Sequence, residues 1–343
     1  MSKVTQLKHR KAAHIKINLE EDVHSGLTSG LEHYRFIHEA LPDLSLESVN
    51  TATSLFGKEL AAPILISSMT GGTRTAKKIN QRLAETASEM KLAMGVGSQR
   101  SAIEDSALVD TFSVARKSAP SILLFANLGA VQLNYGYSID HCHRAVDMIE
   151  ADALILHLNP LQESLQVHGD TNFAGLAKKI EGVCKKLDVP VIIKEVGWGI
   201  SEKTAKILSS CGVAAIDVAG AGGTSWSQVE MYNAPDDFTS RLAATYIDWG
   251  IPTVNSIQNV KKAAPGVSII ASGGLKDGLD IAKSIALGAT LGGMAGQILN
   301  AAFISTEKAI ELMKLTRLQI QISMFAAGIG NIQDLGSGSL EEL

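Results

Sequence analysis

Short apolar runs recur along the chain, and each is followed by a longer segment of mixed polarity. The runs are nearly continuous in Ile, Leu, Val and Ala, which is typical of parallel strands that are buried on both faces. We expect one strand in each of eight runs: residues 63–69, 92–97, 122–128, 153–158, 191–196, 214–220, 267–274 and 289–296.

The segments between the runs have apolar residues at helical spacing, as in TAKKINQRLAETASEMK and NFAGLAKKIEGVCKKL. Alternating strands and helices predict an α/β fold closed as a (β/α)8 TIM barrel, with an open doubly wound sheet as the alternative. Closure is favoured because no early GxGxxG turn opens a helix, and because polar residues follow many strands rather than one switch point. We expect an N-terminal extension that caps the barrel (1–60), the barrel itself (61–303), and C-terminal helices with a frayed tail (304–343).

Composition narrows the class of protein further. The net charge of −4 gives no general positive field that would attract nucleic acid or an anionic membrane. The uncharged run from Ser284 to Thr306 is interrupted by glycines and amides, so it predicts a helix, a turn and a short buried strand rather than a membrane span. The basic N-terminus lacks the apolar core of a signal peptide, and Cys142, Cys184 and Cys211 lack metal-ligand spacing. A soluble, cytoplasmic protein with reduced thiols follows.

Candidate chemistry lies where the strands end, because these ends form the active face of such barrels. The glycine-rich loops SGGLKDG and GGMAG follow the last two strands, and their N–H groups could bind a phosphate. Alternatively, these glycines only permit tight turns. A phosphate here, with Lys194 ending the fifth strand, fits a flat cofactor such as FMN across the barrel mouth. The alternative, that Lys194 is simply paired with a neighbouring acid such as Glu195, stays open.

The stretch HLNPLQE ends the fourth strand. Strand alternation places His157 and Asn159 on one face, with Gln162 and Glu163 in the loop above. A carboxylate beside an amide suits Mg2+, whereas zinc is disfavoured because His157 has no second His or Cys at ligand spacing. The alternative for Glu163 is a solvated loop acid.

Two more clusters have competing interpretations. The basic residues of HRKAAH, together with Arg100 after the second strand, could clamp a diphosphate, or the former could be a solvated tail. In GGTSWSQVE, Trp226 is either a shield over a site or core filler, and Glu230 supplies an acid after the sixth strand.

The order of motifs from Arg10 to about residue 300 resembles a known family. RKxxH, MTGG, GSQR, ANLGA, HLNPLQE, IIKEVGWG, GGTSW, DWGIPT, SGGLKDG and ALGA are similar to the motifs of type II isopentenyl diphosphate isomerases. The resemblance implies an FMN-dependent barrel of isoprenoid biosynthesis that interconverts isopentenyl and dimethylallyl diphosphate by 1,3-allylic proton transposition. It also implies reduced FMN as the acid–base group, Mg2+, NADPH as reductant of the flavin, and a homotetramer or homo-octamer.

The resemblance implies roles for individual residues. Catalytic roles fall on Gln162, Glu230 and Lys194, and the Mg2+ ligand is Glu163. Substrate contacts fall on Arg10, Lys11, Ser98, Arg100, His157, Asn159 and Gln162. FMN contacts fall on Met69, Thr70, Gly71, Ser98, Asn127, Lys194, Thr224, Gly274, Leu275, Lys276, Ala295 and Gly296.

The chain departs from the family pattern in two places. Ala219 replaces a hydroxyl residue that many members carry, and the loop SLQVHGD lacks the usual PEG. Two rivals remain: an FMN-dependent 2-hydroxy acid oxidase or dehydrogenase, which would need a His/Arg pair to take a proton, and a phosphate-ligand binding barrel with a decayed site.

Overall fold

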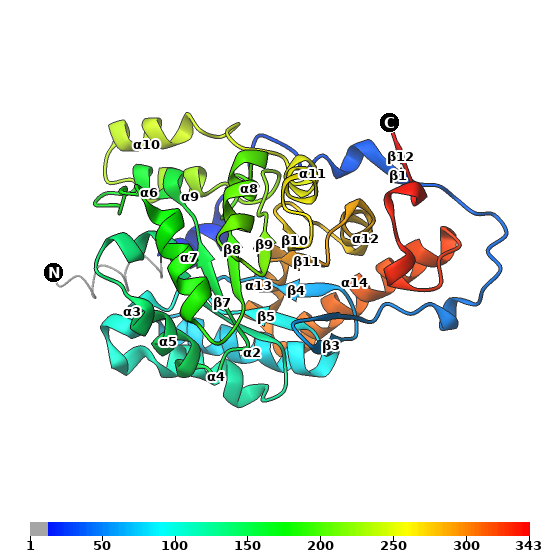
Figure 1. The fold of residues 1–343 in the computed structure, drawn as a ribbon, viewed down its shortest axis with the longest axis horizontal. Helices are drawn as coiled ribbons and strands as arrows, with labels where there is room; N and C mark the ends of the chain where they lie inside the picture. Colours follow the sequence, from blue (N-terminus) through cyan, green and yellow to red (C-terminus); the bar gives the residue numbers. More distant parts are fainter. Residues whose placement is uncertain (1–12) are drawn as a thin grey trace.

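Eight parallel strands close into a barrel in the computed structural model, which describes residues 13–343 (Figure 1). The strands are β4 (Ile64–Ile66), β5 (Ala93–Gly95), β6 (Leu124–Gly129), β7 (Ala153–His157), β8 (Val191–Lys194), β9 (Ala215–Asp217), β10 (Ser268–Ser272) and β11 (Leu291–Met294). Closure is complete because β11 pairs with β4. The predicted (β/α)8 barrel is confirmed, and the open-sheet alternative is wrong.

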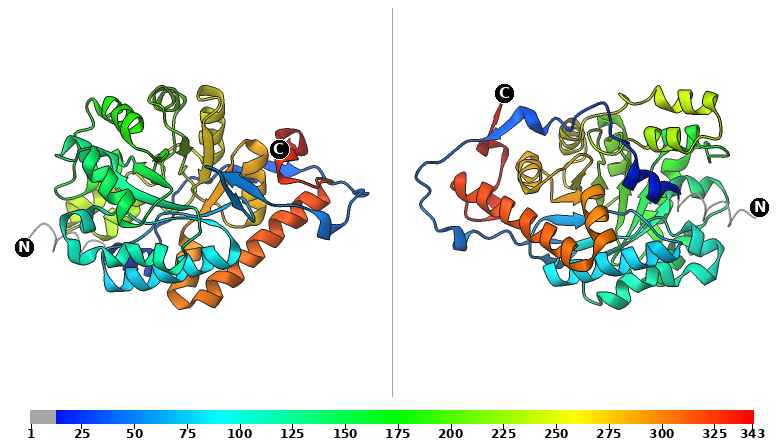
Figure 2. Two further views of the ribbon diagram at one scale, coloured as in Figure 1. Left: turned by 60° about the horizontal axis from the view of Figure 1, so that its bottom comes forward. Right: turned by 180° about the vertical axis from the view of Figure 1, so that it is seen from behind.

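Helices surround the barrel, and Figure 2 shows them from two further directions. The longer ones are α2 (Arg74–Met90), α4 (Asp110–Ser118), α5 (Ile139–Met148), α7 (Leu176–Lys186), α8 (Glu202–Ser210), α11 (Thr253–Ala263), α12 (Gly278–Leu287), α13 (Gly296–Ile304) and α14 (Thr306–Ala326). Shorter helices follow three strand ends: α3 (Arg100–Glu104), α6 (Pro160–Leu165), and α9 (Trp226–Tyr232) with α10 (Asp237–Ala244). Short 3-10 turns lie at Leu31–His33, Leu46–Ser48, Ser106–Leu108, Ala130–Asn134, Ile332–Asp334 and Ser337–Ser339.

The long uncharged run contains the predicted helix and buried strand, followed by a further helix that was not predicted. It contains the end of α12, the strand β11 and the helix α13. Within residues 13–343, no helix combines the length and the apolar character needed to cross a membrane.

A hairpin closes the barrel at the end where the strands begin. Its strands β2 (Thr53–Leu55) and β3 (Lys58–Leu60) pair antiparallel, and Leu55 and Leu60 pack in one cluster with inward residues of the barrel strands. The ring of Phe56 meets that of Phe125 edge to face, with centroids 6.2 Å apart. The hairpin therefore lies opposite the strand ends, and the capping role predicted for residues 1–60 does not extend to it.

The C-terminal tail is ordered against the other end of the chain. Strand β12 (Leu340–Glu342) pairs antiparallel with β1 (Tyr34–Phe36), and the Leu343 N–H donates to the His33 carbonyl at 2.9 Å (Figure 1). The prediction of a frayed tail is wrong. Its polar, glycine-containing sequence gave no sign of the partner strand, because that strand is remote in sequence.

A half-buried ion-pair cluster ties the hairpin to the barrel, and it makes a testable contribution to stability. Asp152 contacts Lys58 Nζ at 2.7 Å and accepts from Arg116 Nη2 and the Leu124 N–H, both at 2.9 Å. Burial works to raise the pKa of Asp152, but these bonds outweigh burial and lower it below the ordinary 3.8. Asp152→Asn should lower the free energy of unfolding by about 1–3 kcal/mol at neutral pH.

The same carboxylate predicts a pH dependence. A group whose pKa is lower in the folded state stabilises fully above its ordinary pKa, and that contribution is lost as pH falls through the folded pKa. The difference between wild type and Asp152→Asn should therefore shrink below pH 3.8. Urea denaturation across pH measures it, with the exposed Asp188→Asn as the matched control. Equal, pH-independent losses in both variants would contradict the assignment.

Candidate active site

A cavity of about 490 Å³ lies at the ends of the barrel strands. A helical segment covering residues 13–20 borders it, seen in dark blue in the right panel of Figure 2. This segment is held in place because the chain after it pairs with the loop that follows β9. The Ser25 N–H donates to the Gly223 carbonyl and the Ser225 N–H to the Val23 carbonyl, both at 2.8 Å. The N-terminal segment therefore forms one wall of the cavity.

The structure brings most of the predicted site residues into this one cavity. Those that line it are Met69, Thr70, Ser98, Arg100, Asn127, His157, Asn159, Gln162, Glu163, Lys194, Thr224, Gly274, Leu275, Lys276, Ala295 and Gly296. Two others lie behind the lining: Glu230 beneath Gln162, and Gly71 against Phe112, whose ring a Cβ at position 71 would approach to 1.9 Å. Arg10 and Lys11 lie outside the described residues.

The HLNPLQE stretch forms a buried hydrogen-bonded network. Strand β7 ends at His157 and α6 begins at Pro160, which suits the first turn of a helix, so Gln162 and Glu163 lie on α6 and not in a loop as predicted. Asn159 Nδ2 donates to Gln162 Oε1 and to Glu163 Oε1, both at 3.0 Å. Glu163 is only 7% exposed. The solvated-acid alternative for Glu163 is therefore wrong.

Glu230 anchors this network from α9. Its Oε1 accepts from Gln162 Nε2 at 3.0 Å and from Gln166 Nε2 at 2.6 Å, and it lies 3.5 Å from His14 Nε2. Burial works to raise the pKa of Glu230, but His14 and the two glutamines outweigh burial and lower it. Because an ionised carboxylate only accepts, the Gln162 amide must direct its NH2 to Glu230 and its oxygen to Asn159.

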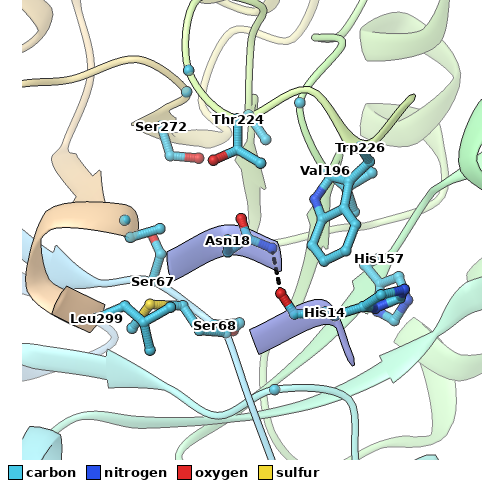
Figure 3. Close-up of a pocket in the computed structure, with 18 of the residues that line it drawn as sticks. His14, Asn18, Ser67, Ser68, His157, Val196, Thr224, Trp226, Ser272 and Leu299 are labelled. Carbon is cyan, nitrogen blue, oxygen red and sulfur yellow. Dashed lines mark hydrogen bonds between the residues drawn. The ribbon is translucent and has the colours of Figure 1, made fainter. Parts of the chain in front are cut away.

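An aromatic contact closes the wall beside Glu230. The rings of His14 and Trp226 meet edge to face with centroids 5.2 Å apart, and both line the cavity (Figure 3). Asn18 Nδ2 donates to the His14 carbonyl at 2.8 Å within the same helical segment. Trp226 is therefore part of the cavity wall, and the core-filler alternative is wrong.

Lys194 pairs with an acid on the neighbouring strand. Its Nζ donates to the Glu195 carbonyl at 2.8 Å and lies 3.6 Å from Asp217 Oδ2 on β9. The Glu195 carboxylate instead accepts from the N–H groups of residues 196, 197 and 198 at 2.5–2.7 Å. Burial, opposed by these bonds and by Lys194, raises the pKa of Glu195 to about 7. Lys194 therefore does pair with a neighbouring acid, as the alternative held, but this acid is Asp217 and not Glu195. Lys194 also lines the cavity.

The opposite wall fits a polar, phosphate-bearing cofactor. Gly273 and Gly274 have φ of 100° and 74°, which favour glycine, and α13 begins at Gly296 without a side-chain cap. The hydroxyls of Ser67 and Ser68 are buried and find no hydrogen-bond partner among residues 13–343. Figure 3 shows both serines at the cavity. Buried polar atoms normally have a partner, so a bound polar group such as a flavin fits here.

The residue at the first departure from the family pattern also lies on this cavity. Ala219 lines it with φ of 35°, and its methyl side chain offers no hydrogen bond there.

The described residues fit Mg2+ only as a partner of a bound anion. Residues 13–343 contain no group of three or more His, Cys, Asp or Glu side chains placed to hold a metal. Glu163 nevertheless offers one carboxylate at the cavity. Mg2+ is often held by one or two carboxylates with substrate phosphates and water, and Glu163 suits that arrangement.

Arg100 is one of the cations that line the cavity, together with Lys194 and Lys276. Its Nε donates to Glu104 Oε1 at 3.0 Å, and its Nη1 donates to Asp170 Oδ2 at 2.8 Å. Burial works to lower the pKa of Arg100, but these two acids outweigh burial and raise it. The guanidinium therefore stays charged at the cavity.

Sequence reasoning gave no role to several side chains that the structure places here. Ser67 and Ser68 follow β4 directly, and the strand-end rule does place them at the cofactor site, although it gave neither an individual role. Gln166, Asp170 and Asp217 carried no such signal, because their roles depend on contacts between separate elements.

The comparisons with known proteins agree with this geometry. The sequence model of the family described as FMN-dependent dehydrogenase matches residues 11–114 and 151–342. Mandelate oxidase with (S)-2-phenylpropionate has a TM-score of 0.68 at 17% identity, covering 98% of this chain and 97% of that one. A flavocytochrome b2 variant with benzoylformate has a TM-score of 0.71 at 15% identity, covering 98% and 85%. The fold and site define a barrel of the FMN-dependent dehydrogenase class.

Closer relatives identify the family within that class. Isopentenyl-diphosphate delta-isomerase of Nostoc sp. is 53% identical over 340 residues, covering 98% of this chain and 97% of the relative. The protein of the same name from Rickettsia bellii is 50% identical over 331 residues, covering 96% of each. The chain belongs to the isopentenyl-diphosphate delta-isomerase family, and the resemblance predicted from its motifs is confirmed.

Proposed function

We propose that this protein interconverts isopentenyl and dimethylallyl diphosphate by moving a proton across the allylic unit, with no net redox change. The names of the close relatives support this reaction. The observation that carries the proposal is the buried chain from Asn159 through Gln162 to Glu230, because it holds an amide at the cavity in one fixed orientation. The rival 2-hydroxy acid oxidase rests on structural likeness at 15–17% identity, which concerns the fold alone.

FMN would lie between the glycine-rich wall and the ends of the first strands. The residues proposed to hold it are Met69, Thr70, Gly71, Ser98, Asn127, Lys194, Thr224, Gly274, Leu275, Lys276, Ala295 and Gly296. When bound and reduced by NADPH, FMN would supply the group that exchanges protons with the substrate carbons. Lys194 would place positive charge beside it, which favours an anionic reduced flavin.

The diphosphate would be held at the other side of the cavity. Arg100, Ser98, His157 and Asn159 would bind its oxygens, together with the N-terminal residues 10 and 11. Glu163 would hold Mg2+, which would offset the negative charge of the diphosphate. Opposite charges on the ligand and on Arg100 make this contact strong where water is excluded.

Gln162 and Glu230 are proposed to position the substrate for the proton transfers. Glu230 stays ionised because its pKa is lowered, and it holds the Gln162 amide by a 3.0 Å hydrogen bond. Gln162 would orient the reacting carbons of the substrate. His14 and Trp226 would exclude water from the positive charge that develops on the substrate when its double bond is protonated.

Anaerobic turnover in D2O tests the proposal. Purified protein with FMN, Mg2+ and NADPH is given isopentenyl diphosphate, and NMR should show dimethylallyl diphosphate with deuterium incorporation. In parallel, mandelate should fail to reduce the oxidised flavin. An FMN-loaded preparation that forms no dimethylallyl product would overturn the isomerase assignment, and flavin reduction by mandelate would favour the oxidase.

Self-association belongs to the same proposal. Leu315, Leu318 and Ile322 on α14 are 53%, 46% and 46% exposed and recur at helical spacing, which supports self-association. The homotetramer or homo-octamer and the cytoplasmic location are proposed from the family resemblance. Light scattering should give four or eight chains per particle, whereas a monomer would contradict this assignment.

A further inference from the structure

The loop after α6 connects the arginine of the cavity with its carboxylate. Asp170 Oδ2 accepts from Arg100 Nη1 at 2.8 Å and from Gln132 Nε2 at 3.1 Å. The backbone N–H of Asp170 donates to Glu163 Oε2 at 2.7 Å. Arg100, Gln132 and Glu163 all line the cavity, while Asp170 itself lies behind the lining. One residue therefore contacts three separate parts of the wall.

The backbone of this loop is bent tightly onto Glu163. His168 has φ of 63°, a conformation that costs energy for a residue with a Cβ. A Cβ at Gly169 would lie 1.8 Å from the Glu163 carbonyl oxygen, so only glycine fits at that position. The Gly169 N–H donates to the Gln166 carbonyl at 3.2 Å. The VHG sequence thus allows the chain to return to Glu163, although it departs from the pattern expected of the family.

The Asp170 side chain is what holds the end of this bend. Its carboxylate receives two donors on a single oxygen, one of them a charged guanidinium, and such charge-assisted bonds are the stronger kind. Fixing the side chain fixes the backbone N–H that reaches Glu163. Glu163 is then held at both oxygens, by Asn159 at Oε1 and by Asp170 at Oε2. The plane of the carboxylate is set before any ligand arrives.

We propose that Asp170 is a positioning residue that couples the diphosphate-binding arginine to the Mg2+-binding carboxylate. This inference rests on the proposed function, and it adds a role for Asp170, a residue that would touch neither the substrate nor the metal. Arg100 has more N–H groups than its two carboxylate bonds use, so Asp170 can orient the guanidinium while other donors bind the diphosphate. Outer partners that orient a metal ligand in this way commonly matter for metal affinity.

The test compares Asp170→Ala with Glu104→Gln in the FMN-loaded protein. Both variants remove one carboxylate from Arg100, but only the former also removes the anchor of the N–H that holds Glu163. The probe is inorganic pyrophosphate, titrated by calorimetry at a series of Mg2+ concentrations. Asp170→Ala should raise the Mg2+ concentration for half-maximal binding by about ten- to a hundredfold. Glu104→Gln should weaken pyrophosphate binding without changing that midpoint.

Flavin fluorescence reports whether each variant keeps its cofactor and fold. Should Asp170→Ala fail to fold, Asp170→Asn replaces it, because the amide oxygen can still accept from Arg100 or Gln132 and should give a smaller shift in the same direction. An Mg2+ midpoint equal to that of wild type, or equal to that of Glu104→Gln, would overturn the coupling. Failure of the proposed function would be seen in a different measurement: the wild-type protein would form no dimethylallyl product, whatever the pyrophosphate titrations give.

Discussion

Replacing Glu163 by Gln should reduce kcat/KM for isopentenyl diphosphate by at least about a hundredfold while FMN stays bound. The carboxylate is the one acid of HLNPLQE, and its two oxygens are held by Asn159 and by the Asp170 N–H. An amide removes the negative charge that Mg2+ needs, and its NH2 would face a donor on whichever side it turned. The Mg2+ concentration for half-maximal rate should rise sharply. It is measured by following the conversion of isopentenyl diphosphate by NMR at a series of Mg2+ concentrations.

Glu21→Gln is the matched control for this variant. Glu21 lines the same cavity but is exposed, so the substitution removes the same charge away from the α6 network. Its Mg2+ dependence should stay close to that of wild type. If Glu163→Gln kept the wild-type Mg2+ dependence, or if both variants shifted it equally, Glu163 would not be the metal ligand.

The barrel could be predicted because its signal is local. Each strand is an apolar run buried on both faces, so the run itself reveals the strand, as at residues 153–158. The strands are shorter than the apolar runs that predicted them, because the last residues of each run already belong to the loops at the cavity. The C-terminal strand β12 gave no such signal, because two of its three residues are exposed glutamates and its stability depends on pairing with β1.

In the candidate site too, the residues that local sequence reveals could be predicted, whereas those that depend on contacts between separate elements could not. Glu163 and Gln162 were predicted because they follow a strand, and the strand-end rule needs only the local sequence. That they lie on a short helix and not in a loop depends on Pro160 and on burial against Glu230, which lies in another element. Asp217 was missed for a similar reason: its carboxylate matters only through the register that places it beside Lys194.

Replacing Lys194 by Met should reduce turnover by about 10²–10³-fold, which is typical for the loss of one preorganised charge at a reacting centre. It should also weaken FMN binding and make the reduced flavin harder to deprotonate. The variant has a second effect, because Asp217 is 1% exposed and its Oδ2 has Lys194 as its ion-pair partner. An uncompensated buried carboxylate costs about 3–5 kcal/mol of folding free energy.

The double variant Lys194→Met with Asp217→Asn separates these two effects. It removes both charges of the pair, and the side-chain amide oxygen at position 217 can still accept from Ser272 Oγ, which donates to Asp217 Oδ1 at 2.5 Å in the wild type. Urea denaturation should therefore show most of the lost stability restored, whereas turnover and the pH titration of the reduced-flavin spectrum should stay as in the single variant. If the double variant regained turnover along with stability, Lys194 would serve only to neutralise Asp217. If Lys194 acts on the flavin, the change in the flavin spectrum caused by its removal must persist in the double variant, even though the stability of the fold has recovered.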